Sequence, residues 1–322
     1  MSSVILKVQD LRTHFFMGQE VLRAVDGISY DVHEGETTIL LGESGCGKTM
    51  SVLSILRMVP APGKVVDGKI IFGGQNLLEA SEEEMINIRG QGISMVFQEP
   101  MTSLNPIIPI GEQIAEPLKE HLKMSSKSAR KRAIELMHLV GLPDPERRHR
   151  EYPFQFSAGM RQRVMIAMAL SCNPKILIAD EPTTALDVTI QAQILDLITG
   201  LAKQTGTAVI LITHNLGLVA RYADTVNVMY AGRIIESGLA DAVCDKPMHP
   251  YLQGLLQCIP RIENLDDQQL NPIYGRPPDL SQKINGCYFQ PRCPISFTSC
   301  SKQYPSLDLV GDGHYCACFA RR

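Results

Sequence analysis

The chain has 322 residues, a formal net charge of −3, and 44% hydrophobic against 20% charged residues. These values exclude a disordered chain and leave enough sequence for one large domain or two smaller ones. The near-neutral charge gives no electrostatic reason to expect binding to nucleic acid or to a membrane surface. No apolar run reaches the roughly 18–20 residues that cross a bilayer. The first residues also lack the pattern of a signal peptide, so we expect a cytosolic chain.

Short apolar runs alternate with amphipathic segments along most of the chain. The apolar runs, rich in Val and Ile, are 37–41, 93–97, 175–179 and 207–213. Helical spacing of apolar residues separates them at 48–57, 159–170 and 190–203. Continuous apolar runs of this length are typical of buried strands in a mostly parallel sheet. The alternation therefore predicts an α/β fold.

Three segments depart from this alternation. Residues 1–36 alternate apolar and polar side chains, which predicts half-exposed antiparallel strands. Residues 111–170 show helical spacing with little strand character, which predicts an inserted helical segment. After about residue 240 proline and loop signals become frequent, and five of the nine cysteines fall in the last 36 residues.

A phosphate-binding loop is predicted between the first buried strand and the helix that follows it. Its residues fit the pattern G-x-x-x-x-G-K-[ST] and run Gly42, Glu43, Ser44, Gly45, Cys46, Gly47, Lys48, Thr49, with Met50 next on the helix. Backbone N–H groups of such a loop surround phosphate oxygens, and the helix N-terminus adds a favourable dipole. Lys48 would reach the β- and γ-phosphates, and Thr49 would bind Mg²⁺. A chance glycine-rich turn is the alternative, and the flanking strand and helix argue against it.

Two acidic residues end the buried strand at 176–179. We expect Asp180 to help hold Mg²⁺ and Glu181 to polarise the water that attacks the γ-phosphate. An ordinary acidic turn is the alternative, and the phosphate loop makes it less attractive. Cys46, inside that loop, is interpreted as a packing residue.

Four further motifs, in the expected order, resemble the ATP-binding subunits of ABC transporters over about residues 5–240. They are Phe156-Ser157-Ala158-Gly159-Met160 in place of LSGGQ, Gln98 as the Q-loop, Ala185-Leu186-Asp187 as the D-loop and His214 as the switch histidine. The resemblance implies a P-loop NTPase (RecA-like) core with an N-terminal antiparallel β subdomain, an inserted helical subdomain and a C-terminal cysteine-rich extension. The implied boundaries are 1–98 and 169–240 for the core, 99–168 for the helical subdomain with the signature, and 241–322 for the extension.

The resemblance also assigns roles in a head-to-tail dimer, where ATP lies between one phosphate loop and the partner's signature helix. Ser157, Ala158 and Gly159 would face ATP held by the partner, and Asp187 would lie at the interface. His214 would contact the γ-phosphate. Gln98 would link the Mg²⁺ site to the helical insertion.

The same resemblance leads to two further expectations, one about the residue that stacks on adenine and one about the signature motif. Phe15, or else Phe16, would stack on adenine, and plain strand packing is the alternative. Ala158 adds a methyl group where the family has glycine, so we expect the ATP site it completes on a partner to be the slower of two unequal sites.

Longer stretches are similar to the dipeptide and oligopeptide importers, and most of all to the first ATPase subunit of a dipeptide permease. They are 98–106, 181–193, 249–251 and the tail with Gly286–Pro294, Cys300, His314 and Cys318. The family implies two different ATPase subunits, two transmembrane permease subunits and an extracytoplasmic peptide-binding protein, with no nucleic acid. This chain would then lie peripherally on the cytoplasmic face of the inner membrane. The alternatives are an importer of nickel or another small solute, a soluble non-transport ABC ATPase, and a metal-binding regulator with a vestigial ATPase.

The cysteine tail predicts a metal centre, because a reducing cytosol disfavours disulfides. Four thiols, Cys287, Cys293, Cys300 and Cys318, are separated by gaps wider than the C-x₂₋₄-C pairs of structural zinc sites. The family resemblance favours a [4Fe–4S] cluster of structural role, with Cys316 as the alternative fourth ligand. Zn²⁺, a disulfide, free buried thiols and a redox-sensing role remain alternatives. Cys172, Cys244 and Cys258 are expected to be packing residues.

Overall fold

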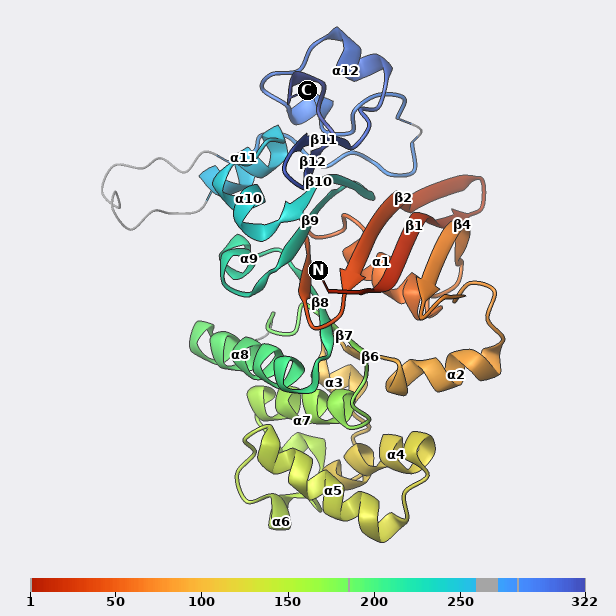
Figure 1. Cartoon of the computed structure of the whole chain (residues 1–322), viewed down its shortest axis with the longest axis vertical. Helices are drawn as coiled ribbons and strands as arrows, with labels where there is room; N and C mark the ends of the chain where they lie inside the picture. The colour runs from red at the N-terminus through yellow and green to blue at the C-terminus, as the bar shows by residue number, and fades with distance from the viewer. Residues whose placement is uncertain (1, 185, 259–271, 283, 322) are drawn as a thin grey trace, which may run out of the picture. The chain divides into compact units, whose positions relative to one another are not determined.

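The computed structural model describes residues 2–184, 186–258, 272–282 and 284–321 (Figure 1). The chain divides into two compact units. The first unit holds residues 1–4, 32–37 and 79–212, and the second holds 5–31, 38–78 and 213–322. Each unit therefore gathers segments that are far apart in the sequence.

The first unit is built on three parallel strands, β6 (Ile93–Val96), β7 (Ile176–Asp180) and β8 (Ala208–Thr213). Strand β7 lies between the other two, with Ile178 opposite Met95 on one side and Ile210 on the other. Every residue of β7 and β8 is buried. The continuous apolar runs are thus confirmed as interior parallel strands, since both faces of such a strand are covered.

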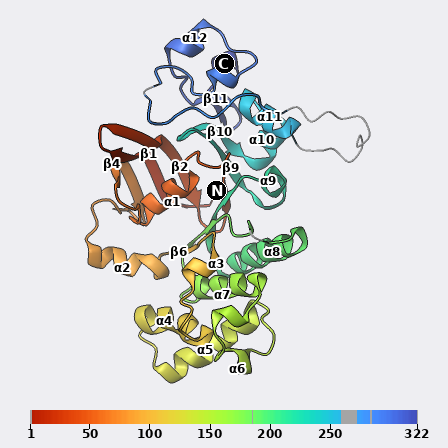
Figure 2. The ribbon, with the colours of Figure 1, turned by 180° about the vertical axis from the view of Figure 1, so that it is seen from behind.

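Helices make up most of the remainder of this unit. They are α2 (Glu82–Gln91), α3 (Pro100–Ser103), α4 (Ile110–Leu122), α5 (Ser126–Leu139), α6 (Pro145–Arg148), η1 (Pro153–Gln155), α7 (Ala158–Leu170) and α8 (Val188–Thr205). Figure 2 shows α4, α5 and α6 gathered beside α7. Helix α4 buries Ile110, Ile114 and Leu118 completely, four residues apart on one face. The helical spacing at 111–170 is therefore confirmed.

The second unit contains an antiparallel sheet of order β2-β1-β4-β5. Its strands are β1 (Val4–Met17), β2 (Glu20–His33), β4 (Gly63–Phe72) and β5 (Gln75–Asn76). A hydrogen bond of 2.7 Å joins Thr13 on β1 to Ser54 on α1 (Lys48–Ile55). The alternating pattern near the N-terminus is confirmed as antiparallel strands.

A second ladder of this unit runs β3 (Thr37–Leu41), β9 (Thr225–Tyr230), β10 (Arg233–Leu239), β12 (His314–Cys316) and β11 (Asp308–Gly311). Strand β3 pairs with β9 in parallel, and the later pairings are antiparallel. Through β12, the C-terminal segment returns to strand β10. The short helices here are α9 (Leu216–Tyr222), α10 (Ala240–Asp245), α11 (Pro250–Gln257), η3 (Gln290–Arg292), α12 (Thr298–Lys302) and η4 (Phe319–Arg321).

Glu236 on β10 ties three parts of this segment together. Its fully buried carboxylate accepts hydrogen bonds from the backbone N–H groups of Met248 and His249, at 2.7 and 2.8 Å, and from Nε2 of His314 at 2.8 Å. A buried carboxylate is tolerated only when its oxygens are paired in this way. Among the described residues, no helix is both long and apolar enough to cross a membrane.

Candidate functional site

The loop from Gly42 to Gly47 joins β3 to α1, as the sequence predicted. Gly47 caps the helix with φ of 100°, in the left-handed region that favours glycine. A Cβ at this position would lie 2.2 Å from the carbonyl oxygen of Ala24, and one at Gly42 would lie 2.4 Å from that of Met229. Close backbone packing therefore requires glycine at both ends of the loop, and at Gly47 the positive φ requires it as well.

Lys48 is buried, with its ammonium group turned back onto the loop. Its Nζ donates to the carbonyl oxygens of Gly42 and Glu43, at 2.7 and 2.9 Å. A phosphate entering the loop would compete with these carbonyls for the same charge. Thr49 and Met50 follow, half-buried, on α1, while Ser44 and Gly45 are exposed.

Cys46 lies within the loop and is buried, 3.9 Å through its Sγ from Nζ of Lys48. Burial raises the pKa of this thiol, and the neighbouring Lys48 opposes the shift. A neutral, enclosed thiol fits the prediction of a packing residue.

Asp180 and Glu181 follow β7 with different surroundings. Asp180 is the last residue of the strand and is 3% exposed, whereas Glu181 is half-exposed and has φ of 42°. The carboxylate of Glu181 accepts a hydrogen bond of 3.0 Å from Thr184 Oγ1, and its Oε2 lies 3.4 Å from Nε2 of Gln98. The structure thus brings together the predicted Q-loop glutamine and the predicted water-activating carboxylate.

Two of the predicted interface residues cap helices. Ser157 Oγ accepts from the N–H of Met160 at the start of α7, and Asp187 Oδ1 accepts from the N–H of Ile190 at the start of α8. Both side chains are exposed. Ala158 is the first residue of α7, and a Cβ on Gly159 would come within 3.2 Å of Ile190 Cγ2. Ala185 lies outside the described residues.

The remaining predicted ATP contacts lie in the second unit. His214 is exposed between β8 and α9. Phe15 on β1 is half-buried over Gly63, where a Cβ would meet its ring at 2.7 Å, and Phe16 is 44% exposed. The roles of these residues, like those of the whole predicted ATP site, stay predictions.

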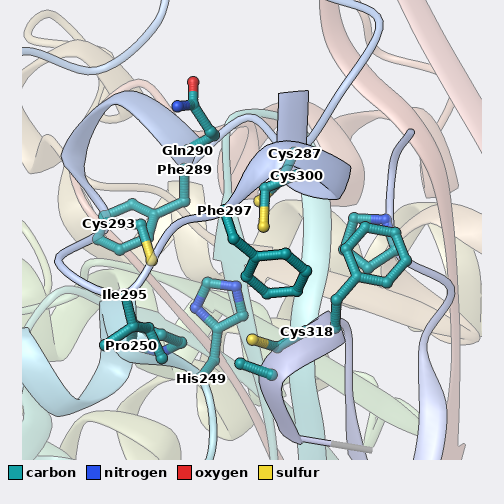
Figure 3. A pocket seen from close by; sticks show the side chains of 13 residues that line it. His249, Pro250, Cys287, Phe289, Gln290, Cys293, Ile295, Phe297, Cys300 and Cys318 are labelled. Carbon is teal, nitrogen blue, oxygen red and sulfur yellow. The ribbon is translucent and has the colours of Figure 1, made fainter. Parts of the chain in front are cut away.

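Four of the tail cysteines line one small pocket (Figure 3). They are Cys287, Cys293, Cys300 and Cys318. Cys316 does not line it, because its buried side chain lies on β12 opposite Glu236. The four thiols predicted as ligands therefore lie together, and Cys316, the alternative fourth ligand, lies outside their pocket. In the part of the chain described, no three His, Cys, Asp or Glu side chains are arranged to hold a single metal ion.

The thiol pocket is apolar around its sulfur atoms. Burial raises the pKa of Cys287 to about 11, and the nearby Cys300, Cys293 and Cys318 add to the shift. Burial likewise raises the pKa of Cys293 and of Cys318. These thiols are therefore neutral unless a cation compensates their charge.

His249 also lines the pocket, which the sequence did not indicate. Burial lowers its pKa to about 3, so the imidazole is neutral. Its Nδ1 accepts the N–H of Tyr251 at 3.1 Å and caps α11. The sequence offered only the His-Pro-Tyr motif as a signal for this residue. It gave no signal for Phe289 and Phe297, whose rings complete the apolar wall in Figure 3.

Two family models match the chain. One, described as ABC transporter, covers residues 25–184, and the other, described as oligopeptide/dipeptide transporter, C-terminal region, covers 235–300. Among solved structures, the ADP- and Pi-bound dimeric ATP-binding cassette MJ0796 is 29% identical with a TM-score of 0.66, covering 73% of this chain and 98% of that one. The cassette fold with its antiparallel β subdomain and helical insertion is thus confirmed.

Full-length relatives narrow the family further. The dipeptide transport ATP-binding protein DppD of Bacillus subtilis (strain 168) is 49% identical over 316 residues, which are 98% of this chain and 94% of the relative. The oligopeptide transport ATP-binding protein AppD of the same organism is 48% identical, covering 98% and 97%. DppD of Escherichia coli (strain K12) is 46% identical, covering 98% and 96%. The chain therefore belongs to the family of ABC-transporter ATP-binding proteins that includes the dipeptide and oligopeptide transport ATPases.

Proposed function

We propose that this chain is the ATP-hydrolysing subunit of a peptide importer. The observation that carries the proposal is the near full-length similarity to dipeptide and oligopeptide transport proteins, which extends through the C-terminal region. That region lies outside the ATP-binding motifs, so ATP chemistry alone does not explain the similarity. The alternative of a nickel or other small-solute importer would share the same ATPase, because the solute site would lie on other chains.

Each group of the predicted site has a physical role in phosphoryl transfer. Backbone N–H groups of the loop and the charge of Lys48 stabilise the negative charge on the transferring γ-phosphoryl group. Glu181 orients the attacking water, and Gln98, 3.4 Å away, restrains that carboxylate. His214 would complete the contacts to the γ-phosphate.

The oxygen-rich set Thr49, Gln98 and Asp180 fits Mg²⁺, which prefers hard oxygen ligands. Asp180 is a buried carboxylate at the end of β7, whose charge a cation would offset. The ion would neutralise charge shared by the β- and γ-phosphates.

The exposed start of α7 supports a dimeric mode of action. Ser157 is exposed at the N-terminus of this 13-residue helix, whose dipole would favour an anion held by a second ATPase subunit. We propose a heterodimer of two ATPases beneath two permease subunits, supplied by an extracytoplasmic binding protein. The chain would then be held peripherally on the cytoplasmic face of the membrane.

Ala158→Gly should accelerate ATP hydrolysis by the assembled complex. The methyl group of Ala158 stands at the first position of α7, where the backbone would approach a phosphate. Its removal should raise the steady-state rate by up to about tenfold, which corresponds to about 1.4 kcal/mol in the activation barrier. Ala158→Val should lower the rate. An unchanged ATPase rate for Ala158→Gly would rule out unequal sites caused by this residue.

We also propose a [4Fe–4S] cluster in the thiol pocket. The donors fit such a cluster, because four thiols line one apolar pocket and thiolates are the ligands that iron–sulfur clusters take. Cys287, Cys293, Cys300 and Cys318 would hold it as thiolates. Its role would be to staple a proline-rich tail that has little core of its own. Zn²⁺ is the second candidate.

Affinity purification of this chain from its native membrane tests the assembly. We expect two polytopic membrane proteins and a second ABC ATPase to co-purify in equal amounts. Co-purification with ribosomes or nucleic acid instead, and no membrane protein, would favour a non-transport ABC ATPase.

A further inference from the structure

The tail that carries the thiol pocket is bonded directly to the phosphate loop. Arg292 lies between Cys287 and Cys293, and its guanidinium donates to both carboxylate oxygens of Glu43, at 3.0 and 3.2 Å. The Arg292 side chain is only 6% exposed. A bidentate pair with a buried guanidinium fixes geometry more tightly than a surface ion pair does.

Glu43 is held at three points, and all of them bear on the loop. Its carboxylate meets Arg292, its N–H donates to the hydroxyl of Tyr251 at 3.0 Å, and its carbonyl oxygen accepts from Lys48. Glu43 therefore contacts both Arg292 and Lys48, so a shift of Arg292 would also move the lysine that would meet the phosphates.

An aromatic cluster fixes Arg292 itself. The rings of Tyr230 and Phe289 flank the guanidinium at 5.8 and 5.9 Å, and the Tyr230 hydroxyl accepts from it at 3.3 Å. Tyr251 packs against both rings. These contacts hold the guanidinium in the orientation in which it meets Glu43.

A second path runs from the residue beside Cys287. The hydroxyl of Tyr288 donates to Asp26 at 3.1 Å, and the N–H of Asp26 donates to the carbonyl of Gly232 at 2.8 Å. The N–H of Gly232 in turn donates to the carbonyl of Cys46 at 2.9 Å. Arg292, next to Cys293, and Tyr288, next to Cys287, are therefore connected to the phosphate loop by two separate sets of hydrogen bonds.

We propose that Arg292 is a positioning residue for the phosphate loop, acting through Glu43, so that the cysteine-bearing tail sets the affinity for ATP. The family motifs place no tail residue in the ATP site, so this role goes beyond the proposed function. A change in the geometry of the loop should change the affinity for ATP, because a small displacement of a group that binds phosphate has a large effect on binding.

A double-mutant cycle on the holoprotein tests the proposal, with ATP affinity measured by calorimetry and KM and kcat by steady-state hydrolysis. Arg292→Gln and Glu43→Gln should each weaken ATP binding about tenfold, and the double variant no more than either alone. KM should rise more than kcat falls. Arg276→Gln, an exposed arginine of the same tail, should match the wild type.

Two results would overturn the proposal: wild-type ATP affinity in Arg292→Gln, or losses that add in the double variant. If Arg292→Gln fails to fold, Arg292→Lys replaces it, because lysine keeps the charge but not the fork. It should show an intermediate loss of affinity, and wild-type affinity would again contradict the role.

A further arm, which rests on the metal site proposed above, uses the reciprocity of linked binding. Arg292 directly precedes Cys293, so ATP should slow the release of metal to a chelator in the wild type, and should slow it less in Arg292→Lys. Equal release with and without ATP would contradict the link. A protein that contains no metal would contradict the metal site, and the cycle would still decide the role of Arg292.

Discussion

Glu181→Gln should lower the rate of ATP hydrolysis by about 10²–10⁴-fold while leaving ATP binding intact. The amide has the shape of the carboxylate and can keep the hydrogen bond to Thr184 at 3.0 Å, but it cannot draw a proton from water. ATP should therefore accumulate between closed ATPase subunits. Phosphate release and retained nucleotide, measured on the assembled complex, check both halves of this expectation.

The matched control is Glu83→Gln, a glutamate exposed on α2 in the same unit. It should hydrolyse ATP at the wild-type rate. Brisk hydrolysis by Glu181→Gln would remove Glu181 from its role, and loss of ATP binding would show that the substitution acts on structure instead.

Cys293→Ser should strip the purified protein of iron and labile sulfide, and should lower the thermal midpoint of the C-terminal region. The metal's binding energy is also folding energy when it crosslinks a segment with little core. The thiol of Cys293 lines the pocket together with three others, so its loss leaves the proposed cluster with an incomplete ligand set. Iron and sulfide assays and a melting curve give the two readouts.

Cys316→Ser is the control, because this buried thiol is directed beside Glu236 and not into the pocket. It should keep its iron. Loss of iron from Cys316→Ser but not from Cys293→Ser would reverse the ligand assignment. Zinc without iron in the wild type would refute the cluster.

The sequence predicted those elements best whose structure follows from the pattern of residues within the element itself. Continuous apolar runs predicted the buried strands β3 and β7, and the phosphate loop was located from its glycines and its flanking elements. The helix expected at 190–203 begins earlier, at Val188, because Asp187 caps it. The helix expected to reach residue 57 ends at Ile55, and Arg57 has φ of 51°, outside the helical region.

Pairings between distant residues were beyond the sequence. Arg292 and Glu43 are 249 positions apart, and nothing in the local spacing of either indicates the other. The family resemblance favoured Cys318 over Cys316, and tertiary structure supplies the physical reason, since β12 ends at Cys316 and pairs it with Glu236 on β10. Spacing alone does not show where a strand ends.

Transport by the reconstituted complex tests the central claim most directly. Proteoliposomes containing this chain, a second ATPase, two permease subunits and the binding protein would be given a labelled dipeptide. We predict accumulation of the peptide that requires ATP and disappears with Glu181→Gln. ATP hydrolysis without peptide accumulation, or ATP-driven uptake of Ni²⁺ and not of peptide, would contradict the account.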